Sequence, residues 1–224
     1  MKIVPVIDLL NGKVVRAIGG KRDEYKVINS RLCPEGDPLK FIKNLGAPIV
    51  YVADLDAITG GEVQIQLLEE ISSHVKTWID AGIKKVDEMK DISEIASKVI
   101  IATETFQDYG NLEKHECKDI LMSIDMYKGK IISSKNYFKD PFEILERFEK
   151  FVEGFILLDL YHVGRFSGIW DDFTKYITKT EKEIIVGGGI RDKTDLFKLK
   201  NIGIHAVLVG SALHNGKIEL RWRI

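Results

Sequence analysis

One short pattern occurs twice in the 224-residue chain. An apolar strand ends in an aspartate, and a Gly-Lys turn then leads into a second short strand. The first copy is Ile7-Asp8-Leu9 with Gly12-Lys13, and the second is Ile124-Asp125-Met126 with Gly129-Lys130. Three further strand-end segments of the first half also recur, about 105 to 107 positions later. Four such units in each half predict eight strands, and the repeated carboxylate suggests a pair that acts together.

Short apolar runs alternate with longer amphipathic stretches along the chain. This alternation is typical of successive β/α units whose parallel strands are buried on both faces. Helices are expected between the strands, with Asp37-Pro38 at one helix start and Gly46 at its end. The helical pattern is weakest from Phe106 to Glu116. The predicted strands are residues 3–7, 49–53, 75–79, 98–102, 120–124, 154–158, 184–187 and 205–209.

Eight β/α units with a twofold internal repeat predict a (β/α)8 TIM barrel built from two half-barrels. An open doubly wound sheet is the alternative, but it normally has fewer strands and a glycine-rich turn after the first strand. Here the glycine-rich turn follows the seventh. No linker rich in Pro, Gly or Ser interrupts the chain, so we expect one domain over residues 1–224, with half-barrels of about 1–117 and 118–224.

Bulk composition argues against two classes of partner. With 33 basic and 34 acidic residues, the net charge of −1 favours neither nucleic acid nor an anionic membrane. The apolar stretch at the N-terminus is too short for a signal sequence or membrane anchor. Cys33 and Cys117 have no ligand spacing, so a reduced, cytoplasmic chain without zinc is expected.

The two repeated aspartates are the candidate catalytic residues. The carboxyl ends of barrel strands converge on one face, where catalytic side chains sit. Asp8 ends the first strand and Asp125 the fifth, so the two carboxylates are expected to face each other across the mouth of the barrel. Such a pair can divide into a general acid and a general base, and this chemistry requires no metal or organic cofactor. The alternative is that each aspartate only caps its turn.

Two glycine-containing turns are the candidate phosphate site: Gly187-Gly188-Gly189 after the seventh strand and Gly210-Ser211 after the eighth. Their N–H groups and the following helix N-termini can approach an anion, and these loops often bind phosphate in barrels. The candidate residues are Gly188, Gly189, Gly210 and Ser211.

The equivalent turns in the first half, after the third and fourth strands, lack this glycine-containing sequence. They read Asp80-Ala81-Gly82-Ile83-Lys84 and, one strand later, Thr103-Glu104. Asp80 and Glu104 would repel a phosphate, although Lys84 can reach an anion. A second phosphate site is therefore doubtful on the sequence alone.

Other residues are candidates for binding substrate. The loop from Arg16 to Tyr25 combines Gly19-Gly20 with several cations and suits a lid over an anionic substrate, although an ordinary mobile loop explains it equally well. Asp54, Asp159 and His162 lie at strand ends and either line the mouth or form structural hydrogen bonds. The remaining histidines show no ligand spacing and are expected to be surface or boundary residues: His74, His115, His205 and His214.

These segments resemble the half-barrel enzymes of histidine biosynthesis, the phosphoribosylformimino-aminoimidazole carboxamide ribotide isomerase and the cyclase subunit of imidazole glycerol phosphate synthase. The resemblance covers residues 3 to about 219. It implies the barrel, the acid/base roles of Asp8 and Asp125 and the second-half phosphate site. The chain departs from the family after the third strand, where a Gly-Gly-Gly-Ile-Arg turn is usual, and at Tyr51, where the isomerase often has a histidine.

The sequence therefore predicts an isomerase-like enzyme that performs an Amadori-type aldose–ketose rearrangement on a phosphoribosyl or phosphosugar compound. Its expected partner is a phosphorylated small molecule, and the altered turn after the third strand favours a smaller ligand with one phosphate. One alternative is a cyclase-type lyase, which would require a glutaminase partner. Another is a barrel that binds a phosphorylated ligand without turnover.

Overall fold

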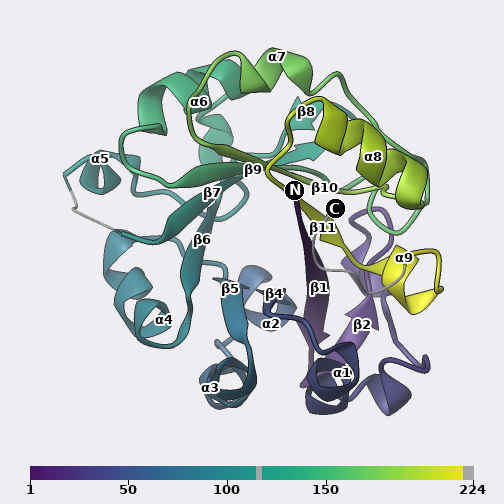
Figure 1. Cartoon of the computed structure of the whole chain (residues 1–224). Coiled ribbons are helices and arrows are strands. Elements are labelled where there is room, and N and C mark those ends of the chain that lie inside the picture. The colour runs from purple at the N-terminus through teal and green to yellow at the C-terminus, as the bar shows by residue number, and fades with distance from the viewer. Residues whose placement is uncertain (115–117, 219–224) are drawn as a thin grey trace.

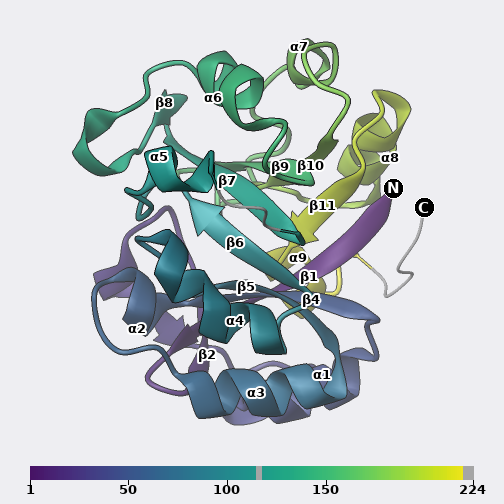
Figure 2. The same ribbon diagram turned by 90° about the vertical axis from the view of Figure 1, so that its left-hand side faces the viewer.

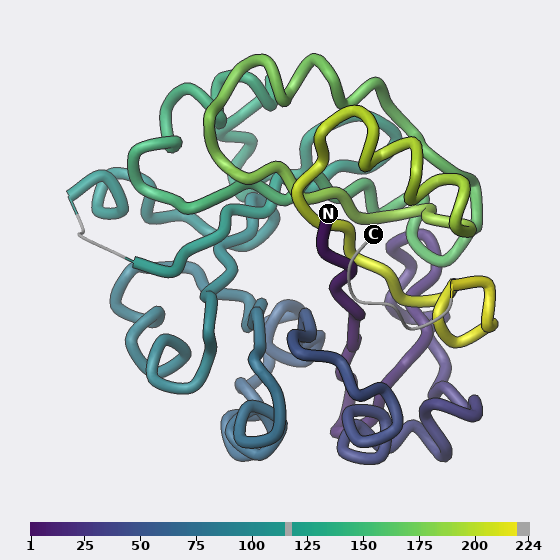
Figure 3. The backbone as a smooth tube through the Cα atoms, viewed as in Figure 1, coloured from purple at the N-terminus to yellow at the C-terminus, as the bar shows by residue number. Residues whose placement is uncertain are grey.

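The computed structural model describes residues 1–114 and 118–218. Its eight parallel strands pair in a ring, and the last strand pairs with the first, with Lys2 opposite Ala206. Figure 3 shows this closure, with the purple first strand beside the yellow last strand of the barrel. Each predicted strand falls on one of the eight, so the barrel is confirmed and the open sheet is wrong. The strands are β1 (Lys2–Leu10), β4 (Ile49–Asp54), β5 (Lys76–Asp80), β6 (Lys98–Ala102), β7 (Ile120–Tyr127), β9 (Gly154–Asp159), β10 (Glu183–Gly187) and β11 (Ala206–Val209).

Helices lie outside the ring of strands (Figure 1). The longer ones are α1 (Pro38–Leu45), α3 (Ile65–His74), α4 (Met89–Ile95), α6 (Pro141–Phe148) and α8 (Lys193–Asn201). Single turns form α2 (Leu55–Ile58), α5 (Tyr109–Leu112), α7 (Thr174–Ile177) and α9 (Ser211–His214). Short 3-10 segments are η1 (Arg22–Glu24), η2 (Pro34–Gly36), η3 (Val86–Glu88) and η4 (Ser134–Asn136).

The ends of α1 follow from the residues that flank it. The Asp37 carboxylate accepts hydrogen bonds from the N–H groups of Leu39 and Lys40, both at 3.0 Å. Proline at the first helical position costs no hydrogen bond, and Gly46 ends the helix with a φ of 58°. Both predicted helix ends are confirmed. The weak pattern from Phe106 to Glu116 gives only the single turn α5, and residues 115–117, which include His115, lie outside the described residues.

The repeated aspartate pattern folds the same way twice. β2 (Lys13–Arg16) pairs antiparallel with β1, and β8 (Lys130–Ile131) pairs antiparallel with β7. Both connecting turns have two residues with positive φ, Asn11-Gly12 (49° and 72°) and Lys128-Gly129 (53° and 75°). This is the type I′ geometry that suits a tight hairpin. Figure 2 shows β2 and β8 at the end of the barrel away from the N-terminus.

Alternate strand residues build two separate apolar layers, because successive side chains point to opposite faces of a strand. The outer layer packs the strands against helix residues such as Phe41, Leu68 and Phe148. The inner layer fills the barrel. Toward the carboxyl end of each strand, the next inward-facing positions, two residues apart, are polar. On β5, Asp80 follows Trp78, and on β7, Ser123 and then Asp125 follow Leu121. The fold therefore directs these carboxylates into the mouth of the barrel.

Candidate active site

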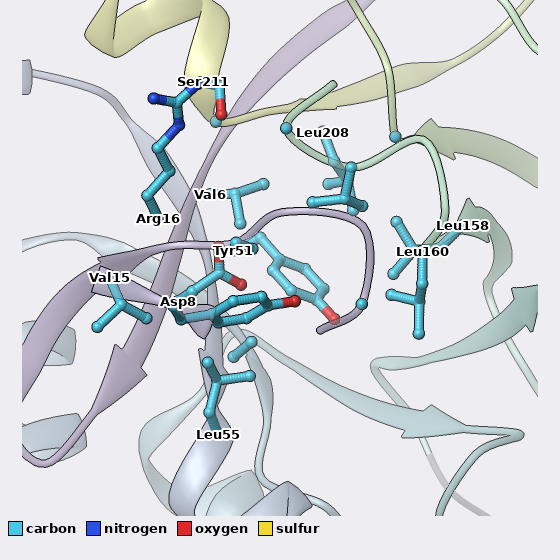
Figure 4. A pocket seen from close by; sticks show the side chains of 18 of the residues that line it. Val6, Asp8, Val15, Arg16, Tyr51, Leu55, Leu158, Leu160, Leu208 and Ser211 are labelled. Carbon is cyan, nitrogen blue, oxygen red and sulfur yellow. The ribbon is translucent and has the colours of Figure 1, made fainter. Parts of the chain in front are cut away.

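A pocket opens at the carboxyl ends of the strands. Its lining combines residues of β1, β4, β5 and β7 with the loops that follow β2, β6, β9, β10 and β11. Four acidic side chains contribute to it: Asp8, Asp80, Glu104 and Asp125. Figure 4 shows Asp8 and Tyr51 within this pocket, with Arg16 and Ser211 among the other lining residues. A polar mouth above an apolar interior is the arrangement expected of a ligand site in a barrel.

Asp8 and Asp125 stand on opposite strands, because β1 and β7 are four places apart in the ring of eight. Both carboxylates line the pocket. Burial raises the pKa of Asp8 to about 7, and the positive charge of Arg22 only partly opposes this rise. Burial also raises the pKa of Asp125 well above its ordinary value, and the negative charges of Glu104 and Asp80 add to the effect.

Asp125 is held firmly. Its side chain is only 3% exposed. Ser123 Oγ donates to Oδ1 at 2.7 Å, and the N–H of Glu104 donates to Oδ2 at 3.2 Å. The N–H of Asp125 itself donates to Thr103 Oγ1 at 2.9 Å. These bonds fix the direction of the carboxyl group, as a proton-transfer residue requires.

Asp80 and Tyr51 form a second polar pair in the pocket. The Tyr51 hydroxyl donates to Asp80 Oδ2 at 3.2 Å, and the N–H of Gly82 donates to Asp80 Oδ1 at 3.1 Å. Burial raises the pKa of Asp80 to about 6. Tyr51 has its own pKa raised by burial and by the carboxylates of Asp80, Asp125 and Asp8, so its hydroxyl stays protonated and remains a donor.

The four candidate phosphate residues, Gly188, Gly189, Gly210 and Ser211, all line the same pocket. Gly188 and Gly189 have φ values of 93° and 80°. A Cβ atom at Gly189 would lie 2.7 Å from the carbonyl oxygen of Gly168, so a larger residue does not fit there. Within the described part of the chain, the N–H groups of Gly189 and Ser211 have no acceptor.

The N-terminus of α8, the helix after β10, is capped by a residue of the chain itself. Asp192 caps α8, since its carboxylate accepts hydrogen bonds from the N–H groups of Thr194 and Asp195. Arg191 is also engaged, because its Nε and Nη2 donate to the Asp195 carboxylate at 2.9 and 2.7 Å. An anion in this part of the pocket would therefore meet the glycine-loop N–H groups rather than the N-terminus of α8 or Arg191.

The loop after β2, residues 17–25, crosses the mouth and is called the lid loop below. Its Arg22 Nη2 lies 2.6 Å from Glu104 Oε2, just beyond β6. On the other side, the N–H of Gly19 donates to the carbonyl of Val163 at 2.9 Å. Gly20, Arg22 and Tyr25 line the pocket. The lid loop therefore covers the pocket and contacts loops of both halves.

Arg16 and His214 lie together in the pocket lining on the side of β11. Arg16 is exposed and forms no ion pair within residues 1–114 and 118–218. Burial, and secondarily the charge of Arg16, lowers the pKa of His214 to about 4. His214 also stacks on Phe41, and its Nδ1 lies 3.0 Å from Ser30 Oγ. His214 is half-buried, as expected of a boundary residue, and it also lines the pocket. No local spacing reveals this place in the lining, because its partners come from remote segments.

Several candidates lie outside the pocket lining. Asp54 and Asp159 are fully buried and accept hydrogen bonds from backbone N–H groups, Asp54 from Ala57 and Gln64, Asp159 from Gly129 and Tyr161. His162 stacks on Trp170, with ring centroids 6.2 Å apart. Lys84 is exposed on the surface. The candidates that line the pocket together are Asp8, Asp125, the four phosphate candidates, Arg16 and Gly20. The candidates outside its lining are Gly19, Asp54, Lys84, Asp159 and His162.

Two features are absent from the described residues. No helix there is long and apolar enough to cross a membrane. No group of three or more His, Cys, Asp and Glu side chains in residues 1–114 and 118–218 has the arrangement of a metal site.

Comparison with known proteins gives a consistent result. The model of the histidine biosynthesis protein family matches residues 2–219. An uncharacterized protein of Methanocaldococcus jannaschii is 35% identical, over 98% of this chain and 96% of its own length. The 1-(5-phosphoribosyl)-5-((5-phosphoribosylamino)methylideneamino) imidazole-4-carboxamide isomerases of Pyrococcus furiosus and Cenarchaeum symbiosum are 31% and 28% identical. They align over 98% and 100% of this chain and over 91% and 99% of their own lengths. With a family match over nearly its whole length, this chain belongs to the histidine biosynthesis protein family.

Proposed function

We propose that this protein is an aldose–ketose isomerase that acts on a phosphorylated aminosugar compound. The observation that carries the proposal is the pair of carboxyl groups with raised pKa, Asp8 and Asp125, on opposite strands of one pocket. The isomerases among the relatives support it, because their names describe substrates that carry phosphoribosyl groups.

The two pKa shifts suggest how the roles divide. Burial and the nearby carboxylates raise the pKa of Asp125 well above its ordinary value, which favours its protonated form and suits it to act as the acid. Asp8, with a pKa of about 7, is partly ionised there and is suited to act as the base. Environments that separate two carboxyl groups in this way are typical of acid/base pairs.

The proposed reaction starts on a ring-closed aminoaldose. Asp125 donates its proton to the ring oxygen, the C1–O bond breaks, and the nitrogen lone pair forms a C1=N bond. Asp8 removes the proton on C2, the C–H electron pair forms a C1=C2 double bond, and the π pair of the C1=N bond returns to nitrogen. The C2 hydroxyl then loses its proton to Asp125, its O–H pair forms the C2=O bond, and the C1=C2 π pair takes up at C1 the proton held by Asp8. Both carboxyl groups return to their starting states, and the product is the aminoketose.

The loops after β10 and β11 are proposed to hold the phosphate. The N–H groups of Gly189 and Ser211 are without protein acceptors in the described chain, and Arg16 lines the same pocket as an exposed cation. Backbone N–H groups and a guanidinium are suited to bind phosphate oxygens. The lid loop would then cover the sugar and limit the access of water.

The decisive experiment is to incubate the protein with the aminoaldose of the relatives and with singly phosphorylated N-substituted ribosylamines. Aldose-to-ketose conversion is followed by absorbance and NMR. We expect Asp8→Asn and Asp125→Asn each to lower the rate at least about 100-fold, since general acid/base groups contribute that much or more. Asp91→Asn, an exposed aspartate of α4, is the control. Wild-type rates in both site variants would disprove the paired-carboxylate mechanism. Phosphate binding by a wild-type protein that converts none of these aldoses would favour a binding function.

A further inference from the structure

Equivalent backbone N–H groups are unpaired in the second half of the pocket and hydrogen-bonded to carboxylates in the first, among the described residues. Gly189 follows Gly82 by 107 positions, and Ser211 follows Glu104 by the same interval. In the second half, the N–H groups of Gly189 and Ser211 have no acceptor within the described chain. In the first half, the N–H of Gly82 donates to the Asp80 carboxylate and the N–H of Glu104 donates to the Asp125 carboxylate. The chain's own carboxylates thus occupy the N–H groups that a second phosphate would need.

We propose that the pocket takes a substrate with one phosphate, and that its β5 and β6 side receives hydroxyl or amino groups at the opposite end of that substrate. This inference rests on the proposed function, in which the loops after β10 and β11 hold the phosphate. It adds that Asp80 and Glu104 determine specificity by excluding a second phosphate.

The charges on the two sides of the pocket support this division. On the β5 and β6 side, the lining cation Arg22 is already paired with Glu104 at 2.6 Å. Asp80, which is 7% exposed, lies on the same side. A phosphate dianion there would meet carboxylates at close range in a poorly solvated space, which is strongly unfavourable. On the β11 side, Arg16 forms no ion pair with a described residue.

The acidic side is suited to hydrogen-bond donors. An ionised carboxylate only accepts hydrogen bonds, and sugar hydroxyls and amines donate them. Glu104 Oε1 accepts no hydrogen bond from a described side chain or backbone group. A donor-rich end of the substrate would therefore find an open acceptor there, whereas a phosphate would bring only further acceptors and negative charge.

Isothermal titration calorimetry on the full chain tests the proposal with two matched pairs of probes. Fructose 6-phosphate and fructose 1,6-bisphosphate differ in the second phosphate, and we expect the monophosphate to bind at least tenfold more tightly. Equal or tighter binding of the bisphosphate would overturn the inference. Glucosamine 6-phosphate and glucose 6-phosphate differ in one amine; tighter binding of the former would identify an amino group as the preferred donor, and equal binding would favour hydroxyls.

Exchanging the residues between the halves provides the controlled test. Asp80→Gly combined with Glu104→Ser gives the first half the residues found at the matching positions of the second. The ratio of the bisphosphate and monophosphate dissociation constants should shift at least tenfold in favour of the bisphosphate. The reciprocal change Ser211→Glu should weaken binding of inorganic phosphate at least tenfold. Asp80→Asn is the conservative variant, because its side-chain oxygen can still accept from Gly82.

The outcomes separate this inference from the proposed function. A ratio that the double variant leaves unchanged would show that Asp80 and Glu104 do not determine specificity, even if the protein is an isomerase. Absence of turnover with any aldose would contradict the proposed reaction but leave the calorimetric comparison intact. Failure of the wild-type protein to bind any of the phosphates would overturn both.

Discussion

Arg22 of the lid loop and Glu104 at the end of β6 form an ion pair with 2.6 Å between Nη2 and Oε2, and both side chains are about one quarter exposed. This contact fastens the lid loop to the acidic side of the pocket. It also holds a positive charge near Asp8, so the pKa of Asp8 is lower than the value that burial alone would produce. The pair therefore links closure of the pocket to the protonation of a candidate catalytic carboxylate.

Removing the ion pair should free the lid loop. We expect Glu104→Gln to increase hydrogen exchange of the backbone amides in residues 17–25 by about tenfold, because partly buried ion pairs contribute more than exposed ones. Glu113→Gln, which breaks the surface pair of Glu113 with Arg147, is the matched control and should leave the lid loop unchanged. Equal protection of the lid loop in Glu104→Gln and wild type would contradict its fastening by this contact.

Removing the cation should change the titration of Asp8. The charge of Arg22 lowers the pKa of Asp8, so Arg22→Ala should raise that pKa above its value of about 7. Carboxyl carbon NMR of labelled aspartate measures the shift directly. Lys21→Ala, at an exposed lid cation that pairs with Glu24, should leave Asp8 unaffected. An Asp8 pKa that stays the same or falls in Arg22→Ala would refute the coupling.

Asp80 should make the protein less stable as the pH rises. Its folded pKa of about 6 lies above the ordinary value of 3.8, so the folded state binds the proton more tightly than the unfolded state. The free energy of unfolding therefore falls between pH 4 and pH 6 and stays lower above that range. The effect is at most about 3 kcal/mol, since one pKa unit corresponds to about 1.4 kcal/mol.

Urea denaturation at pH 4.5 and pH 7.5 measures this effect. The loss of stability between the two pH values should be smaller in Asp80→Asn than in wild type. Asp91→Asn, at an exposed position of α4, should behave like wild type. An Asp80→Asn protein with the wild-type pH dependence would show that Asp80 titrates normally.

Gly82 should not tolerate a side chain. Its φ is 63°, and a Cβ atom would lie 2.7 Å from Ile58 Cα and 2.8 Å from the carbonyl carbon of Ala57. Gly82→Ala should therefore lower the free energy of unfolding by about 2 kcal/mol or more, from backbone strain and overlap together. Gly110, in α5, has no atom within 4 Å of an added Cβ, so Gly110→Ala should be neutral or slightly stabilising. Equal stabilities of the two variants in urea denaturation would contradict this account.

Asp54 should act as a structural acceptor. Its buried carboxylate accepts hydrogen bonds from the N–H groups of Ala57 and Gln64 at 3.2 and 2.7 Å. Asp54→Ala leaves these donors unpaired and should destabilise the fold by about 3 kcal/mol, whereas Asp54→Asn, which keeps one acceptor, should cost less. Thermal unfolding measures the loss, and calorimetry with inorganic phosphate tests the remaining folded protein. Normal stability with lost phosphate affinity would instead make Asp54 a ligand-binding residue.

Much of the architecture could be predicted from the sequence because its signals are local or repeat along the chain. Apolar runs located all eight barrel strands, since parallel strands are buried on both faces. Asp37, Pro38 and Gly46 predicted both ends of α1, because capping depends on adjacent residues. The repeat also predicted that Asp8 and Asp125 would lie on opposite strands, which follows from strand order alone.

The contents of the pocket depended on the tertiary structure. Nothing local to Asp80 shows that Tyr51, on the neighbouring strand, donates to it, or that Arg22 reaches Glu104 across 82 positions of sequence. The place of His214 in the pocket lining could not be predicted either, because its partners Phe41 and Ser30 come from remote segments. Which backbone N–H groups are free and which are occupied also depends on contacts between chain segments. The sequence by itself determined the barrel, the positions of its two aspartates and the difference between its glycine-containing and acidic turns. Only the tertiary structure decided which groups pair with one another in the pocket, because the partners come from segments far apart in the sequence.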